Sequence, residues 1–348
     1  MCRVNWRSNM TKINVKTNPL ACASLLLAAL SLPLSACAEE QLRIAQQFGV
    51  VYLLLNIAQD QKLIEKHGKA DGLDIKVDYQ QLSGGAAVNE ALLSGSVDIA
   101  GAGIGPLFTL WDRTKDRQNV RAVVATGQFP YYLISTNPNV KSIADFTDKD
   151  RIAVPAVGVS VQSRFLQQAS AELWGDKEYK RLDKLQVAVP HPDATAAIIS
   201  NGTEISAHFS NSPFQEQALA ANPKAHIVLN SYSVAGGANT PVVLYTTEKF
   251  RQENPRTYRA FVGAMAEAAA FTAKHPQEAA DAFIRVNNSK IDRKLLLQIL
   301  QSPEVKFSIV PNNTLSLGQF LYRVGAIKHN PQSVKDYFFD DPHVASGS

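Results

Sequence analysis

Three short loops of small and polar residues are the part of this sequence best suited to hold a ligand. They read Ser83-Gly84-Gly85, Gly101-Ala-Gly103-Ile104 and Gly158-Val159-Ser160, and each stands between a strand-like and a helix-like stretch. Free N–H groups at a helix start, at its positive dipole end, suit a carboxylate, sulfonate, phosphate or polarised oxygen. Glycine lets the backbone approach such a group closely. The set therefore predicts ligand binding, although each loop alone is also typical of a tight strand–helix turn.

Aromatic residues flank these loops and could stack on a planar or apolar ligand. They are Phe48, Tyr52, Phe129, Tyr131, Tyr132 and Phe209, and core packing is the alternative interpretation for each. We include Phe48 and Phe129 among the candidate ligand-binding residues. No Arg or Lys lies in the three loops, whereas a strongly charged anion is usually bound by a bidentate Arg. The loops therefore favour a weakly charged or aromatic ligand.

Residue patterns that would support catalysis are missing from the sequence. The seven histidines show no i,i+4 pairing and no spacing with Cys or Asp that is typical of a metal site. There is no G-x-S-x-G motif, no P-loop and no G-x-G-x-x-G motif. His208, in the small-residue stretch 206–212, could face a cleft, but a solvated or hydrogen-bonded histidine is the more common case. We expect a protein without a metal or cofactor and without enzymatic activity.

The chain behind these loops alternates between strand-like and helix-like stretches. Residues 73–79 have strict period two, with Leu73, Ile75, Val77 and Tyr79 on one face, which predicts a half-exposed strand. Further strands are predicted at 97–100, 121–126, 131–135, 151–155, 184–189 and 242–245, and helices at 86–94, from Pro106, and at 161–174, 194–200 and 255–274. Such alternation favours α/β layers with a largely parallel sheet, and ligands of such sheets lie beyond the carboxyl ends of the strands.

One segment of the chain is echoed later. Residues 91–99 align without gaps on residues 197–205, with identical Ala, Ser and Ile and with similar Leu/Ile and Asp/Glu positions. Coincidence between two helix–turn–strand units is one interpretation. The other is a pair of lobes built on one plan.

The first 38 residues are unlike the rest. Four basic residues without an acidic one precede an apolar run, Leu20 to Leu34, and small residues follow. This arrangement is typical of a secretory signal peptide, whereas a membrane anchor fits less well because the run is short and interrupted by Pro33. We predict a signal peptide at 1–38, a start at Met1 or Met10, and a periplasmic protein.

Two cleavage patterns overlap at Cys37. Leu34-Ser35-Ala36-Cys37 resembles a lipobox, in which Cys37 becomes the lipid-carrying first residue of a membrane-tethered protein. Ala36-Cys37-Ala38 also fits the small-x-small pattern of ordinary signal cleavage. The sequence leaves both the lipid-anchored and the soluble form open.

Removal of this segment changes the chemistry of the chain. All three cysteines lie in it, together with four of the 35 Lys and Arg and none of the 31 Asp and Glu, so 31 basic and 31 acidic residues remain. The mature chain is formally neutral and free of disulfides, and thiol chemistry is excluded. The lack of a concentrated basic patch argues against nucleic-acid binding. About 310 residues suit two lobes of ordinary size.

At its loops the chain resembles periplasmic solute-binding proteins of the nitrate, sulfonate and taurine importers, a family that also includes binders of thiamine-pyrimidine precursors. The resemblance runs over residues 41–339. Its best-matching pieces are residues 83–85, 91–98 ("ALLSGSVD"), 101–106, 151–160 ("RIAVPAVGVS") and 193–213. No piece is a signature by itself, but their order and spacing are specific.

The resemblance implies a type II periplasmic-binding fold, in which two α/β lobes enclose a ligand cleft. Residues 41–130 plus 236–348 would form lobe one and residues 131–235 lobe two. Its further implications are a hinge-like closure around a small solute, a monomer, and docking on an inner-membrane ABC permease with a cytoplasmic ATPase. The implied ligand-binding residues are Ser83, Gly84, Gly103 and Ile104 from lobe one, and Gly158, Val159, Ser160, Phe209, Ser210 and Asn211 from lobe two.

The chain departs from the family pattern at one of these loops. Sulfonate binders are richer in hydroxyl groups at the start of the second-lobe helix, whereas Gly158-Val-Ser-Val161 offers a single hydroxyl, which weakens sulfonate or nitrate as the ligand. Relatives that synthesise the thiamine precursor use a Cys-rich motif, which the mature chain lacks. An enzyme or a sensor domain on the same scaffold remains the alternative function, since a fold alone does not decide between them.

Overall fold

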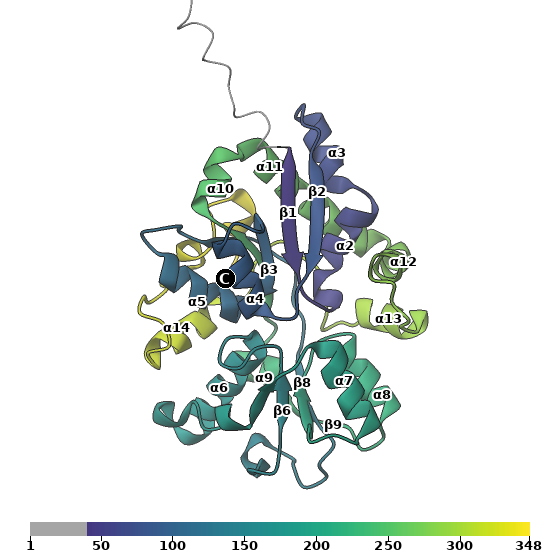
Figure 1. Ribbon diagram of the computed structural model, residues 1–348, viewed down its shortest axis with the longest axis vertical. Coiled ribbons are helices and arrows are strands. Elements are labelled where there is room, and N and C mark those ends of the chain that lie inside the picture. The colour runs from purple at the N-terminus through teal and green to yellow at the C-terminus, as the bar shows by residue number, and fades with distance from the viewer. Residues whose placement is uncertain (1–39) are drawn as a thin grey trace, which may run out of the picture. The chain divides into compact units, whose positions relative to one another are not determined.

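The computed structural model describes residues 40–348, and these residues form two five-stranded sheets with helices packed around them (Figure 1). The predicted signal peptide, its cleavage site and Cys37 lie outside the described residues. Within the described part, no helix combines the length and the apolar character needed to cross a membrane.

The first sheet is built mainly from the N-terminal part of the chain. Its strand order is β2 (Lys76–Gln81), β1 (Gln41–Gln46), β3 (Ile99–Gly103), β10 (Val242–Thr246) and β4 (Arg121–Ala125). β1 pairs in parallel with β2 and β3, while β10 runs antiparallel to both of its neighbours. Strands β3 and β10 are buried along their whole length, which explains their apolar and small residues.

The second sheet repeats this plan in the middle of the chain. Its order is β7 (Gln186–Ala188), β6 (Ile152–Val154), β8 (Ala207–Phe209), β5 (Tyr132–Ser135) and β9 (His226–Asn230). β6 pairs in parallel with β7 and β8, and β5 is antiparallel to β8 and β9. One strand in each sheet therefore opposes the others, and the prediction of largely parallel sheets is confirmed.

The internal echo falls on equivalent parts of the two sheets. Residues 91–99 run from the end of α4 (Gly85–Leu93) into β3, and residues 197–205 run from the end of α7 (His191–Ser200) towards β8. β3 and β8 each occupy the third place in their sheet, between a parallel and an antiparallel neighbour. The interpretation of two units built on one plan is supported by this topology.

The predicted helices agree with the structure at most of their ends. α6 and α11 have the predicted bounds, Gly95 follows α4 with a positive φ of 72°, and α5 begins two residues before Pro106. The sequence analysis did not identify β1, α2, α3, β8, α8, β9 or α9. The remaining helices are α2 (Leu53–Asp60), α3 (Leu63–Ala70), α5 (Ile104–Thr114), α6 (Val161–Trp174), α8 (Phe214–Ala221), α9 (Ser231–Ala235), α10 (Glu248–Glu253), α11 (Pro255–Lys274), α12 (Pro276–Asn287), α13 (Arg293–Leu300) and α14 (Leu315–Arg323).

The N-terminal cap of α10 gives a first test of this architecture. The Thr247 hydroxyl accepts a hydrogen bond from the Phe250 N–H at 3.1 Å. Thr247→Ala should lower the free energy of unfolding by about 1 kcal/mol, because an N–H at the helix start loses its partner. Urea denaturation measures the change. Thr247→Ser keeps the hydroxyl and should lie near wild type, and equal loss in both variants would contradict the cap.

Candidate functional site

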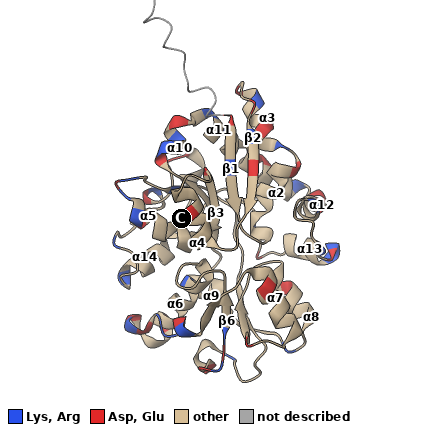
Figure 2. Cartoon of the chain, viewed as in Figure 1, with Lys and Arg blue, Asp and Glu red and all other residues tan. Residues whose placement is uncertain are grey.

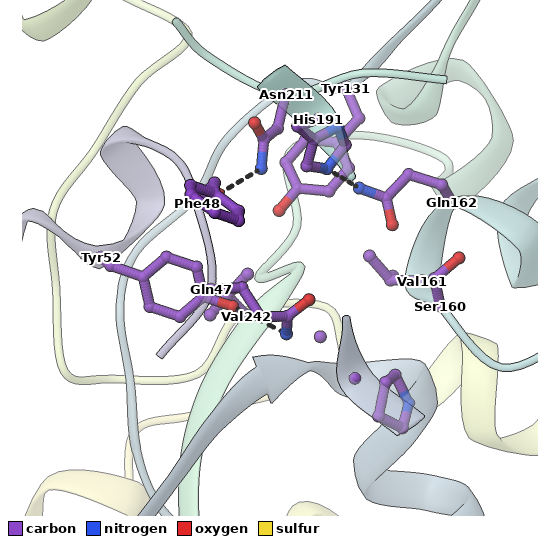
Figure 3. Close-up of a pocket in the computed structure, with 13 residues that line it drawn as sticks. Gln47, Phe48, Tyr52, Tyr131, Ser160, Val161, Gln162, His191, Asn211 and Val242 are labelled. Atoms are coloured by element: carbon purple, nitrogen blue, oxygen red, sulfur yellow. Dashed lines mark hydrogen bonds between the residues drawn. The ribbon is translucent and has the colours of Figure 1, made fainter. Parts of the chain in front are cut away.

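One small pocket is lined by residues that follow the carboxyl ends of parallel strands in both sheets (Figure 3). The cavity is narrow, with a volume of about 20 Å³, which is room for about one water molecule. Tyr131 and Val242 enter it from the starts of the antiparallel strands β5 and β10, which lie at the same sheet edges. The lining residues that follow parallel strands are Gln47 and Phe48 after β1, Gly85 after β2, Gly103 at the end of β3, Ser160 after β6, His191 after β7 and Asn211 after β8.

Four helices begin at this pocket. Gly85 and His191 are the first residues of α4 and α7, Gly103 is the N-cap of α5, and Ser160 is the N-cap of α6. The first N–H groups of a helix have no intrahelical partner, and the helix dipole makes this end positive. The helix starts can therefore stabilise a polarised or negatively charged oxygen in the pocket without help from a cationic side chain.

The start of α6 is held in place by a buried polar network. The Ser160 hydroxyl accepts from the Ser163 N–H at 3.3 Å, and the Ser163 hydroxyl accepts from the Gly158 N–H at 2.8 Å. Ser163 in turn donates to the side-chain oxygen of Gln186 on β7, whose amide donates to Asp183 at 3.0 Å. Because the two hydroxyls and the Gln186 amide are buried with their partners, they fix the loop that presents Ser160 to the pocket.

Glycines let the loops of the two sheets meet closely beside the pocket. A Cβ atom on Gly84 would lie 2.6 Å from the Pro155 carbonyl oxygen, and one on Gly105 would lie 2.9 Å from the Val159 carbonyl oxygen. Real Cβ atoms do not approach backbone atoms this closely, so only glycine fits here. Residues 155–159 come from the second sheet, and Gly84 and Gly105 begin helices of the first.

Aromatic and amide side chains form the walls, and they are uncharged. The Tyr52 hydroxyl donates to the Gly101 carbonyl at 3.3 Å and accepts from Gln47 at 3.1 Å. Burial raises the pKa of Tyr52 and of Tyr131, so both hydroxyls stay protonated. None of the thirteen lining residues is Lys, Arg, Asp or Glu, and Figure 2 shows charged residues mainly on outer helices and loops.

Asn211 connects the two sheets at the pocket wall. Its amide donates to the Phe48 carbonyl at 3.3 Å, and the neighbouring Ser212 carbonyl accepts from the Val50 N–H at 2.8 Å. The Asn211 side-chain oxygen is buried without a hydrogen-bond partner. A buried acceptor without a partner costs about 1–3 kcal/mol, so this oxygen is a place where a ligand donor would stabilise the site.

The structure places the predicted site residues in three groups. Phe48, Gly103, Ser160 and Asn211 line the pocket. The second group belongs to the same loops as lining residues, one or two positions from them, and consists of Ser83, Gly84, Ile104, Gly158, Val159 and Ser210. The third group lies away from the lining: Phe209 is buried within β8, and Phe129 packs edge-on against Phe307 with ring centres 5.2 Å apart.

Four lining residues escaped the sequence analysis: Gln47, Gln162, His191 and Val242. His191 lies two residues beyond the predicted strand 184–189, so the carboxyl-end rule would have found it. Gln47 follows β1, which is not among the predicted strands, so it had no such signal. Gln162 had a weaker signal, its place in the first turn of α6. Val242 had none, because it starts an antiparallel strand.

A larger hollow of about 610 Å³ lies beside α10 and α11. It is lined by residues such as Arg251, Tyr258 and His343, and it lies at neither sheet's carboxyl edge. Arg251 stacks there on Tyr258 and Phe339, with its guanidinium carbon 5.3 and 5.0 Å from the ring centres. By size alone this hollow would be the candidate ligand-binding site. We choose the smaller pocket because strand ends and helix starts from both sheets meet there.

Comparison of the sequence with known protein families assigns the chain to one of them. A profile of the family described as "NMT1/THI5 like" matches residues 69–279. The chain belongs to the NMT1/THI5-like family. No curated protein matches the sequence itself. The family segment covers β2 to α12 and hence most of both sheets.

Solved structures share the fold at low sequence identity. The alkanesulfonate-binding protein SsuA from Xanthomonas axonopodis pv. citri, bound to MOPS, has a TM-score of 0.66 at 16% identity, covering 84% of this chain and 95% of that one. The periplasmic nitrate-binding protein NrtA from Synechocystis PCC 6803 has a TM-score of 0.63 at 14% identity, covering 86% and 84%. A Candida albicans gene product with the generic periplasmic binding protein fold scores 0.59 at 14% identity, covering 86% and 95%. The predicted periplasmic-binding fold is confirmed.

Proposed function

We propose that this protein is the extracytoplasmic substrate-binding component of an ABC-type importer and that it holds a small organic solute in the pocket of Gln47, Tyr131, Ser160 and Asn211. The observation that carries the proposal is the convergence at one pocket of strand ends and helix starts from both sheets. Ligands of open α/β sheets bind at such edges. The structural similarity to SsuA and NrtA supports the same role.

The ligand class follows from the pocket walls. The side chains of Phe48, Tyr52 and Tyr131 suit a flat ring or an apolar body, which the walls would have to part to admit. The helix starts suit one polarised or weakly acidic oxygen. The absence of Lys and Arg among the lining residues argues against a sulfonate or nitrate that would need a bidentate cation. We therefore infer a weakly charged or aromatic solute.

The working cycle would use the two sheets as separate lobes. Residues 41–130 plus 236–348 would form one lobe and residues 131–235 the other, and the chain would close around the solute like a hinge. The closed form would dock on an inner-membrane permease with a cytoplasmic ATPase. Export by the N-terminal signal would deliver the protein to the periplasm, either as a soluble monomer or tethered by a lipid on Cys37.

Native mass spectrometry of the protein purified from its own periplasm tests this function directly. We expect a bound small molecule of one mass, released on denaturation. Added back at 100 times its dissociation constant, it should raise the free energy of unfolding by about 2.7 kcal/mol, seen as a thermal shift. Asn211→Leu, which removes the amide at the pocket wall, should reduce that shift. Turnover of the molecule would contradict the binding role, and an equal shift in Asn211→Leu would contradict the site.

A further inference from the structure

Three side chains form a line from the pocket into the interior of the second sheet's unit. Gln162 of α6 and His191 of α7 line the pocket (Figure 3), and His208 of β8 contacts His191 from outside the lining. The Gln162 side-chain nitrogen lies 3.0 Å from His191 Nε2, and His191 Nδ1 lies 2.8 Å from His208 Nε2. His191 is 4% exposed and His208 is fully buried, so water does not compete for these bonds.

The amide at one end of this line sets the protons along it. An amide nitrogen only donates, so His191 Nε2 must accept and carry no proton. A neutral His191 then carries its proton on Nδ1 and donates it to His208 Nε2. His208 in turn carries its proton on Nδ1. The described contacts leave this last N–H buried without a partner.

Both imidazoles are neutral in this arrangement. Burial lowers the pKa of His191 to about 3, and burial together with the neighbouring His191 lowers the pKa of His208. His191 also stacks on Phe214, with ring centres 5.7 Å apart and planes 14° apart, which holds the ring orientation. A protonated His191 would point an N–H at the Gln162 amide hydrogens, so the arrangement and the charge state agree.

The consequence reaches the pocket through Gln162. One of the two N–H groups of this amide is committed to His191, which fixes the orientation of the amide plane. The carbonyl oxygen is thereby held turned away from His191, as Figure 3 shows, and is the acceptor that Gln162 offers to a ligand. We propose that His191 and His208 are positioning residues that lock Gln162 as a hydrogen-bond acceptor, so that the pocket selects a solute with an uncharged N–H or O–H donor at that point. This inference rests on the proposed binding function and narrows its ligand class.

Nitrogen-15 NMR of the histidine rings in the full chain tests this relay, the hydrogen bonds from Gln162 through His191 to His208, without any ligand. We expect both His191 and His208 as neutral Nδ1–H tautomers from pH 5 to pH 8. His208→Gln and Gln162→Leu assign the signals. In Gln162→Glu the carboxylate cannot donate, so His191 should gain a proton on Nε2 while Phe214 stacking keeps the ring in place. A neutral Nε2–H tautomer of His191 in the wild-type protein would overturn the proposal.

Two probes of nearly equal shape test the selectivity. N-methylbenzamide offers one N–H where methyl benzoate offers an ester oxygen. We expect the amide to bind at least tenfold more tightly, measured by shifts of the Gln162 side-chain amide signals, because the ester would set an acceptor against an acceptor. In His191→Phe, which keeps the stacking but frees Gln162 to rotate, the preference should fall to about threefold or less.

The outcomes separate the two proposals. The proposal that Gln162 is held as an acceptor would be overturned if the ester bound to the wild-type protein as tightly as the amide or more tightly. It would also be overturned if the preference for the amide were unchanged in His191→Phe. If neither probe binds while the NMR tautomers are as expected, the relay stands and the aromatic ligand class is contradicted instead. If natural ligand is recovered but contains no N–H or O–H donor, the binding function stands and the selectivity is overturned.

Discussion

Gly84→Ala should weaken solute binding by at least 30-fold while leaving the fold of the chain intact. The added Cβ would lie 2.6 Å from the Pro155 carbonyl oxygen, so the loop of the second sheet must retreat from the start of α4. The backbone of Gly84 is extended, with φ −169° and ψ 166°, which any residue adopts, so the substitution does not strain the loop itself. A 30-fold loss corresponds to about 2 kcal/mol of binding free energy.

The measurement is the affinity for the solute recovered by native mass spectrometry, together with the urea midpoint of each variant. Gly202→Ala is the matched control, because a Cβ there would meet only the Ser200 carbonyl oxygen at 3.8 Å. It should bind like wild type. Wild-type affinity of Gly84→Ala would show that the close approach of residues 84 and 155 is not needed for binding. An unfolded Gly84→Ala would contradict the prediction that this contact affects binding and not the fold.

Acidification should destabilise the protein through its two buried histidines. The pKa of His191 falls from its ordinary value of 6.5 to about 3 in the folded chain, and that of His208 falls as well. Between pH 6.5 and pH 3 these two imidazoles bind protons in the unfolded chain but stay neutral in the folded chain. The free energy of unfolding therefore falls as pH falls, by about 1.4 kcal/mol per pH unit for each buried imidazole.

Urea denaturation at a series of pH values measures this slope. Burial raises the pKa of Asp183 and Glu216, which opposes the slope, and hydrogen bonds lower the pKa of Asp150, which adds to it at lower pH. The comparison with variants isolates the histidines: His191→Phe with His208→Leu should flatten the profile between pH 6.5 and pH 4.5. Thr195→Val removes a hydrogen bond to the His191 carbonyl without a titrating group, so it should lower stability but keep the slope. A wild-type slope in the double variant would contradict the prediction.

The sequence determined the local elements and the class of the fold. The alternation over residues 73–79 predicted the β2 region, where Leu73 and Ile75 are buried and the intervening Asp74 and Lys76 are exposed. The apolar spacing of α6 and α11 predicted both helices with their bounds. These signals are local, since burial of one face imposes a period on a strand or helix wherever it packs. The echo of residues 91–99 and 197–205 likewise anticipated two sheets with one topology.

Tertiary structure decided which residues meet at the site. Gly103 and Ser160 were predictable because each lies in a loop that follows a predicted strand, and strand ends of one sheet lie together. Phe48 and Asn211 follow β1 and β8, which are not among the predicted strands, and were named from the flanking aromatic residues and from the family resemblance. The hydrogen bond between Gln162 and His191 was not predictable, because it joins residues of two helices that lie 29 positions apart in sequence. Spacing along the chain carries no information on such a pair. The glycine-containing loops at 83–85, 101–104 and 158–160 thus supply main-chain N–H groups to the pocket. The hydrogen bonds that orient its side chains depend on the packing of separate helices.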